Sequence, residues 1–166
     1  NYQNDFEQLD ALIYTKWLDL IAVSETKTIG EVSYVFCSDE FLLQINQDYL
    51  GHDTFTDIIT FDYCEEVLIN GEIYISTDRV KQNAISFGVS LINELQRVMA
   101  HGLLHLCGYG DKSEAEAQLM RDKENEKIGM FHVKQSTQTI RPARYTAGLY
   151  NESTLLCKHT ARLYAI

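Results

Sequence analysis

The stretch Glu94–Asp111, ELQRVMAHGLLHLCGYGD, carries two histidines four residues apart, His101 and His105. Apolar residues recur around them at helical spacing, so we predict a helix that ends at Gly108, a residue type common at this position. Four residues bring a helix slightly past one turn, so both imidazoles should project from one face and could bind one metal ion. The chain then reaches Asp111, whose carboxylate could fold back as a third ligand.

Two histidines at this spacing also occur by chance, and a buried histidine is often simply hydrogen-bonded in the core. Two features favour a metal site. Gly102 lies inside the predicted helix at a cost of about 0.5–1 kcal/mol relative to alanine, which predicts close approach of another element. His101 lies among apolar residues, where an imidazole without a partner would be costly. Zinc peptidases carry glutamate after the first histidine, and Gly102 occupies that position here, which disfavours a peptidase.

The rest of the chain mixes helical and strand patterns. Apolar spacing and capping residues predict helices over residues 6–22, from Ser38 to about Tyr49, from Thr77 to Phe87, and from a Ser113/Glu116 capping box to about Ile128, before Gly129. A cap at Ser90 begins the histidine helix. Strands are predicted over residues 31–37, 56–63 and 72–76, with Asn70-Gly71 as a type I′ turn. The predicted fold class is α+β: a small mixed β-sheet packed with helices, one of which is the metal-binding helix with the H-x-x-x-H pair.

Length and composition suit a single globular domain. The chain has 166 residues, of which 45% are hydrophobic, and no apolar run is long enough to span a membrane. Its cysteines form no C-x-x-C pair, so we interpret them as reduced thiols of a cytoplasmic protein: Cys37, Cys64, Cys107 and Cys157. The helical spacing places Cys107 away from the metal face.

The net charge of −10 disfavours general attraction to nucleic-acid backbones. The charge is uneven, because residues 135–166 hold four basic residues and one acidic residue. The remainder is therefore more acidic than the whole chain. A nuclease of this composition would need local basic groups or a partner. Candidates near the predicted site are Arg79, Lys81, Arg97, Lys112 and Arg121.

The segment HGLLHLCGYGD resembles the signature of the YbeY family of bacterial rRNA-maturation endoribonucleases, H-G-x-L-H-L-x-G-Y-x-H. Asp111 stands where the family commonly has its third zinc-binding histidine, and aspartate is also an acceptable zinc ligand. The likeness covers roughly residues 32–126. It continues in two further motifs, around the Thr56-Asp57 strand and in the G-E-I-x-I-S segment from Gly71 to Ser76.

Two departures from the family pattern stand close to these motifs. Leu50 follows Tyr49 where the family commonly has an arginine thought to handle RNA. Phe55 and Asp62 replace the prolines that flank the Thr-Asp strand. The loss of an arginine removes a bidentate phosphate donor. The RNA role is therefore less directly indicated than the metal site.

The resemblance implies a zinc-dependent, single-strand-specific endoribonuclease in ribosomal RNA maturation, with roles in small-subunit rRNA processing and ribosome quality control. Its substrate would be single-stranded RNA or precursor rRNA, and its partners ribosomal proteins or a ribosome-assembly GTPase, with no membrane association. One Zn²⁺ would be bound by His101, His105 and Asp111, leaving a position for water. Residues 1–134 would form a single metal-dependent hydrolase domain, and residues 135–166 a C-terminal extension outside the resemblance.

The residues leave several alternatives open. The protein could be a metallohydrolase with a substrate other than RNA, or a ribosome-associated binding module with a structural zinc site. No general base can be assigned from sequence. Asp57 and Glu72 are candidates for supporting the metal ligands, or are strand-end residues that satisfy turn amides.

Overall fold

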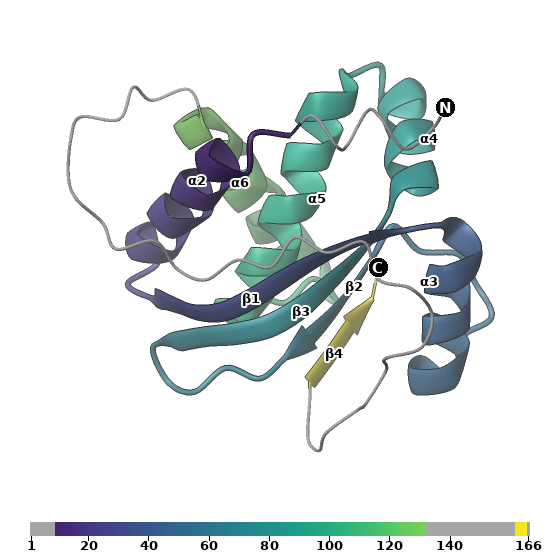
Figure 1. The fold of residues 1–166 in the computed structure, drawn as a ribbon, viewed down its shortest axis with the longest axis horizontal. Coiled ribbons are helices and arrows are strands. Elements are labelled where there is room, and N and C mark those ends of the chain that lie inside the picture. Colours follow the sequence, from purple (N-terminus) through teal and green to yellow (C-terminus); the bar gives the residue numbers. More distant parts are fainter. Residues whose placement is uncertain (1–8, 132–161, 166) are drawn as a thin grey trace.

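The computed structural model describes residues 9–131 and 162–165. The helices are α2 (Ala11–Ser24), α3 (Asp39–Ile45), the π-helical turn η1 (Asn46–Leu50), α4 (Thr77–Phe87), α5 (Leu91–Leu106) and α6 (Glu114–Phe131). The strands are β1 (Thr28–Cys37), β2 (Ile58–Asp62), β3 (Leu68–Ser76) and β4 (Arg162–Ala165). Helices and strands mix along the chain as an α+β fold, which confirms the predicted class (Figure 1).

The strands form one four-stranded sheet in the order β1-β3-β2-β4. β1 runs parallel to β3, whereas β2 runs antiparallel to both β3 and β4, so the sheet is mixed as predicted. β4 belongs to the segment predicted to be a C-terminal extension, and it pairs with β2 at the edge of the sheet. The remainder of that extension, residues 135–161 and 166, lies outside the described residues.

The turn predicted at Asn70-Gly71 is wrong. β3 continues through both residues, and the chain reverses between β2 and β3 near Glu66, whose φ is 49°. Gly71 serves close packing instead, because a Cβ there would lie 2.6 Å from the carbonyl oxygen of Phe61 and 2.8 Å from the side chain of Leu106. Glycine in a strand often marks such an approach, which a turn pattern in the sequence cannot distinguish.

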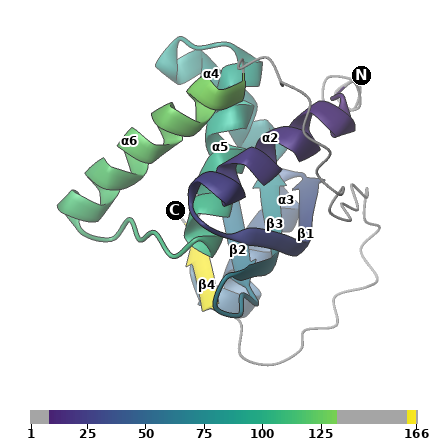
Figure 2. The ribbon, with the colours of Figure 1, turned by 90° about the vertical axis from the view of Figure 1, so that its left-hand side faces the viewer.

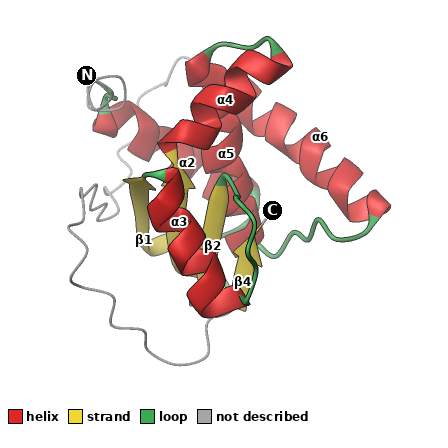
Figure 3. Ribbon diagram, turned by 90° about the vertical axis from the view of Figure 1, so that its right-hand side faces the viewer, coloured by secondary structure: helices red, strands yellow, loops and turns green. Residues whose placement is uncertain are grey.

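Helices cover both faces of the sheet. α2 and α5 lie on one face and α3 on the other, and α6 packs against α5 and α2 (Figures 1, 2 and 3). Alternation along the strands supplies both cores: Ile58 and Ile73 are buried with α2 and α5, whereas Ile59 and Tyr74 are buried with α3. α5 is thus held between the sheet and α6, and twelve of its residues are buried.

Most of the predicted helix caps are confirmed, at Ser38, Ser90 and the Ser113/Glu116 capping box. α4 is capped by Ser76 and not by Thr77, one residue earlier than predicted. α6 continues through Gly129, and α2 begins at Ala11 behind a side-chain cap from Asp10. The part of the first predicted helix before residue 9 lies outside the described residues. Among the described helices, none combines the length and apolar character needed to cross a membrane.

Candidate metal centre

Helix α5 carries both histidines near its C-terminal end. Their ring centroids lie 4.4 Å apart, and only 4% of His101 and 1% of His105 is exposed. Gly102 lets the helix approach the sheet, because a Cβ there would lie 2.8 Å from Ile73 and 2.9 Å from Ile58. The close approach predicted at this glycine is therefore confirmed, and it sets the depth at which the histidines lie.

The turn after α5 returns Asp111 to the two histidines. Gly108 adopts a φ of 103°, a conformation that favours glycine, and the chain reverses directly after the helix. Oδ2 of Asp111 then lies 3.6 Å from Nε2 of His101 and 3.4 Å from Nε2 of His105. Ligand atoms of these three residues all lie within 4.8 Å of one another, so the group could hold one metal ion.

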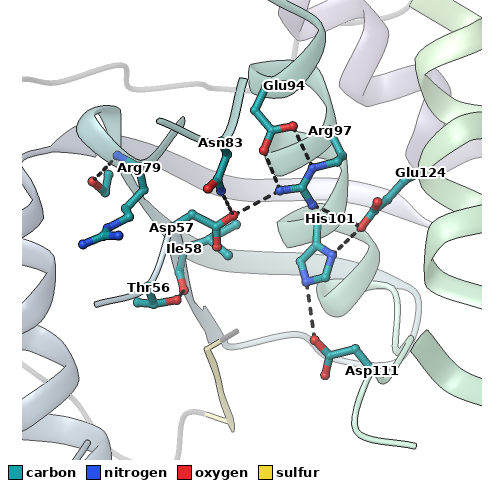
Figure 4. Close-up of polar contacts among 11 residues, drawn as sticks. Thr56, Asp57, Ile58, Arg79, Asn83, Glu94, Arg97, His101, Asp111 and Glu124 are labelled. Carbon is teal, nitrogen blue, oxygen red and sulfur yellow. Dashed lines mark hydrogen bonds and ion pairs between the residues drawn. The ribbon is translucent and has the colours of Figure 1, made fainter. Parts of the chain in front are cut away.

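The second ring nitrogen of each histidine is held by an acceptor. Nδ1 of His101 lies 2.6 Å from Oε1 of Glu124 on α6, and Nδ1 of His105 lies 2.9 Å from the backbone carbonyl of Tyr109. A carboxylate and a carbonyl can only accept, so each Nδ1 carries a proton and each Nε2 is left to face Asp111. Figure 4 shows His101 between Glu124 and Asp111. Acceptors behind metal-binding histidines fix ring orientation in this way.

This arrangement suits a cation. A neutral imidazole with its proton on Nδ1 presents a lone pair at Nε2, and a lone pair facing a carboxylate is repulsive unless positive charge lies between them. Nε2 of His101 is buried and has no hydrogen-bond partner among the described residues. Burial alone would lower the pKa of His101, but Asp111 and Glu124 outweigh it and raise that pKa. Burial and the neighbouring His101 lower the pKa of His105.

A chain of ion pairs extends from Glu124 behind the centre (Figure 4). Nη1 of Arg97 lies 3.8 Å from Oε1 of Glu124, and its Nη2 lies 2.8 Å from Oε1 of Glu94 and 3.1 Å from Oδ2 of Asp57. Asp57, one of the two residues predicted to support the ligands, thus connects to His101 through Arg97 and Glu124. This indirect connection is consistent with a supporting role.

Glu72, the other candidate, lies on the opposite face of the sheet. Its neighbours Gly71 and Ile73 face α5, so strand alternation directs Glu72 toward the α3 side. There it accepts a hydrogen bond from the hydroxyl of Tyr74 at 3.5 Å. Glu72 therefore lies on the face of the sheet away from the histidines, and this contact joins it to a side-chain hydroxyl within β3.

Glu124 was not among the site residues expected from the sequence. α6 is rich in charged residues, and the residues it buries are Met120, Glu124 and Lys127, which recur at helical spacing. A carboxylate at one of these buried positions was the signal in the sequence that could have indicated Glu124. The contact of Tyr109 was also missed: its hydroxyl donates to Oε2 of Glu25 at 2.6 Å, which ties the Asp111 turn to the end of α2.

The described cysteines are free thiols, at Cys37, Cys64 and Cys107, and Cys157 lies outside the described residues. Burial is the main cause that raises the pKa of all three described thiols to about 12. Metals bind the thiolate form, so these neutral thiols are poor ligands at neutral pH. Cys107 packs against the larger apolar cluster, as expected for a residue away from the histidine face.

The fold and the convergent residues define an α+β protein with a candidate His-His-Asp metal centre. The family model described as Endoribonuclease YbeY matches residues 1–132. The chain therefore belongs to the YbeY family of endoribonucleases, which confirms the resemblance found in the sequence and the expectation of an enzyme family.

Relatives that match over nearly their whole length carry the same name. The chain is 54% identical over 135 residues to Endoribonuclease YbeY of Flavobacterium johnsoniae, a match that covers 81% of this chain and 97% of the relative. It is 53% identical over 136 residues to the protein of that name from Flavobacterium psychrophilum, covering 82% and 97%. The solution structure of a Thermotoga maritima protein matches with a TM-score of 0.55 and 30% identity, covering 72% of this chain and 80% of the other.

Proposed function

We propose that this protein is a zinc-dependent endoribonuclease that cleaves single-stranded RNA during ribosomal RNA maturation, with precursor small-subunit rRNA as substrate and the cytoplasm as its location. Residues 1–134 would form the hydrolase domain and residues 135–166 a C-terminal extension. The family match over residues 1–132 and the relatives named endoribonuclease support this proposal.

The observation that carries the proposal is the convergence of His101, His105 and Asp111, whose ligand atoms lie within 4.8 Å of one another. Two imidazoles and a carboxylate are ligands that zinc accepts, and three protein ligands are the usual number at a catalytic zinc site. The Asp111 side chain is 18% exposed, whereas both histidines are buried, so the centre would be reached beside Asp111.

The protein residues would fix the ion and its surroundings. A zinc ion held by these three residues would act as a Lewis acid toward a phosphoryl oxygen and a water molecule. Glu124 and the Tyr109 carbonyl keep the proton on each Nδ1, so that Nε2 is the nitrogen offered to the ion. Neutral imidazoles and one carboxylate would leave the loaded centre with a single net positive charge, which attracts phosphate locally in an acidic chain.

RNA binding by the isolated chain should be weak, because the net charge is −10 and two expected basic contacts are occupied. Arg79 pairs with Asp39 at 2.9 Å, and Arg97 pairs with Glu94 at 2.8 Å. Leu50, at the position where the family commonly has arginine, packs against the apolar cluster on the α3 side. We propose that ribosomal proteins or a ribosome-assembly GTPase supply the missing affinity.

The test is cleavage of a single-stranded RNA, and of the matching duplex, by zinc-loaded protein with His105→Ala purified alongside. We expect cleavage of the single strand by the wild type and its loss in the variant. Equal cleavage by His105→Ala would identify a contaminating nuclease and overturn the catalytic proposal. Zinc binding without cleavage would favour a structural zinc site in a binding module.

A further inference from the structure

An open cavity of about 600 Å³ lies beside the candidate metal centre, between the start of β2 and helices α4, α5 and α6. Three residues of the ion-pair chain behind His101 form part of its wall: Asp57, Arg97 and Glu124. A molecule in the cavity would therefore be one side chain away from His101. The metal-ligating residues themselves do not line the cavity, so its role has to be inferred from its own chemistry.

Aromatic rings stand exposed at this cavity. Phe55 is 49% exposed and Phe87 is 63% exposed, and both line it. The guanidinium carbon of Arg79 lies 4.5 Å from the centroid of the Phe55 ring, so a cation and an aromatic ring are already stacked there. Unpaired RNA bases stack on such aromatic side chains and on the plane of arginine guanidinium groups.

One arginine at the cavity is available for a phosphate. Arg97 is held by Glu94 and Asp57, whereas Arg121 is exposed and hydrogen-bonds to the neutral side chain of Gln118 at 3.0 Å. Within the described part of the chain, Arg121 has no carboxylate partner. Its guanidinium can therefore bind a phosphate without first breaking an ion pair.

We propose that this cavity binds an unpaired nucleotide next to the phosphodiester bond that is cleaved, with the base stacked at Phe55 and a phosphate contacted by Arg121. This rests on the proposed endoribonuclease function and assigns part of its preference for single strands. A base held within a duplex cannot stack on a protein ring without first leaving its neighbours.

The test measures binding of a short fluorescein-labelled single-stranded RNA by anisotropy, with EDTA present so that the RNA stays intact. Phe55→Ala should weaken binding roughly tenfold, within the range expected for one lost base stack, whereas Phe55→Tyr should bind like the wild type. Ile13→Ala is the matched control, because Ile13 is 46% exposed on α2 and does not line the cavity. With zinc restored, Phe55→Ala should raise the KM for RNA cleavage and leave kcat nearly unchanged.

An RNA with abasic nucleotides separates stacking from other effects. Phe55→Ala should bind it as tightly as the wild type does, because the base that Phe55 would hold is gone. Arg121→Gln should weaken binding of both RNAs and lower the salt slope by about 0.7, the value for one phosphate on a single strand. Lys16→Gln, which removes an exposed charge on α2, should leave that slope unchanged.

The outcomes distinguish this inference from the proposed function. Wild-type affinity in Phe55→Ala, or an equal loss on intact and abasic RNA, would overturn the nucleotide site while leaving cleavage at the metal centre intact. Binding that depends on Phe55 without any zinc-dependent cleavage would uphold the nucleotide site and overturn the nuclease. Circular dichroism of each variant establishes that the fold is retained.

Discussion

Helices α5 and α6 both contribute to the candidate metal centre, but their amino-acid compositions differ sharply. α5 is largely apolar and buries both histidines against the sheet, with Gly102 at its closest approach. α6 is rich in charged residues and buries three residues, one of which is Glu124, the acceptor behind His101. The two histidines that would bind the ion thus form a short, recognisable motif on α5, and Asp111 follows in the turn after it. The residue that orients one of them comes from a helix whose composition suggests an exposed surface.

The largest effect should follow from removing the ligands on α5. His101→Ala and His105→Ala should each lower bound zinc well below one ion per chain, because two protein ligands hold zinc poorly. Elemental analysis of the purified variants measures this. Wild-type zinc content in both variants would place the ion elsewhere in the protein.

Removing the Glu124 carboxylate on α6 should weaken zinc binding less than removing a histidine does. Glu124→Gln keeps the volume but removes the anionic acceptor at Nδ1 of His101, and loss of such an acceptor typically costs about 10–100-fold in metal affinity. Competition with a zinc chelator measures the affinity. Asp122→Asn, an exposed carboxylate on the same helix, is the matched control and should bind zinc like the wild type. Equal zinc affinities in Glu124→Gln and the control would show that Glu124 does not support zinc binding.

The two glycines within the described helices, Gly102 and Gly129, should change stability in opposite directions when replaced by alanine. Gly102→Ala places a Cβ 2.8 Å from Ile73 and should destabilise the fold by about 1–3 kcal/mol through overpacking. Gly129→Ala on α6 meets no atom within 4 Å and should stabilise it by about 0.5–1 kcal/mol. Urea unfolding measures both. A Gly102→Ala protein as stable as the wild type would contradict the close packing of α5 against the sheet.

The smallest effect concerns Glu25, which ties the end of α2 to Tyr109 and α6. Burial alone would raise the pKa of Glu25, but hydrogen bonds from Lys127, Tyr109 and Lys123 outweigh it and lower that pKa to about 2. The folded pKa lies below the unfolded one, so this contribution to stability is present above about pH 4.5 and is lost as the pH falls toward 2. Glu25→Gln should therefore lose less stability than the wild type over this window. Parallel acid unfolding curves would show that Glu25 contributes nothing there.

The sequence predicted those features that depend on local periodicity or on a contiguous motif. The α+β class, the mixed sheet and the helix that ends at Gly108 follow from spacing and capping, and His101, His105 and Asp111 lie together as their spacing suggested. Contacts between residues far apart in the sequence were harder to predict. The Asn70-Gly71 pair satisfies a turn pattern, but packing of Leu106 and of the neighbouring strand explains the glycine. Glu124 lies twenty-three residues from His101, and no local pattern links the two.

We propose above all that His101, His105 and Asp111 form an open zinc centre. The most direct measurement is zinc stoichiometry combined with zinc K-edge X-ray absorption on the purified 166-residue chain. We expect one zinc per chain, with two imidazole nitrogens, one carboxylate oxygen and a remaining position not filled by a protein side chain. A site closed by four protein ligands, or a spectrum that is the same in Asp111→Ala, would contradict the account.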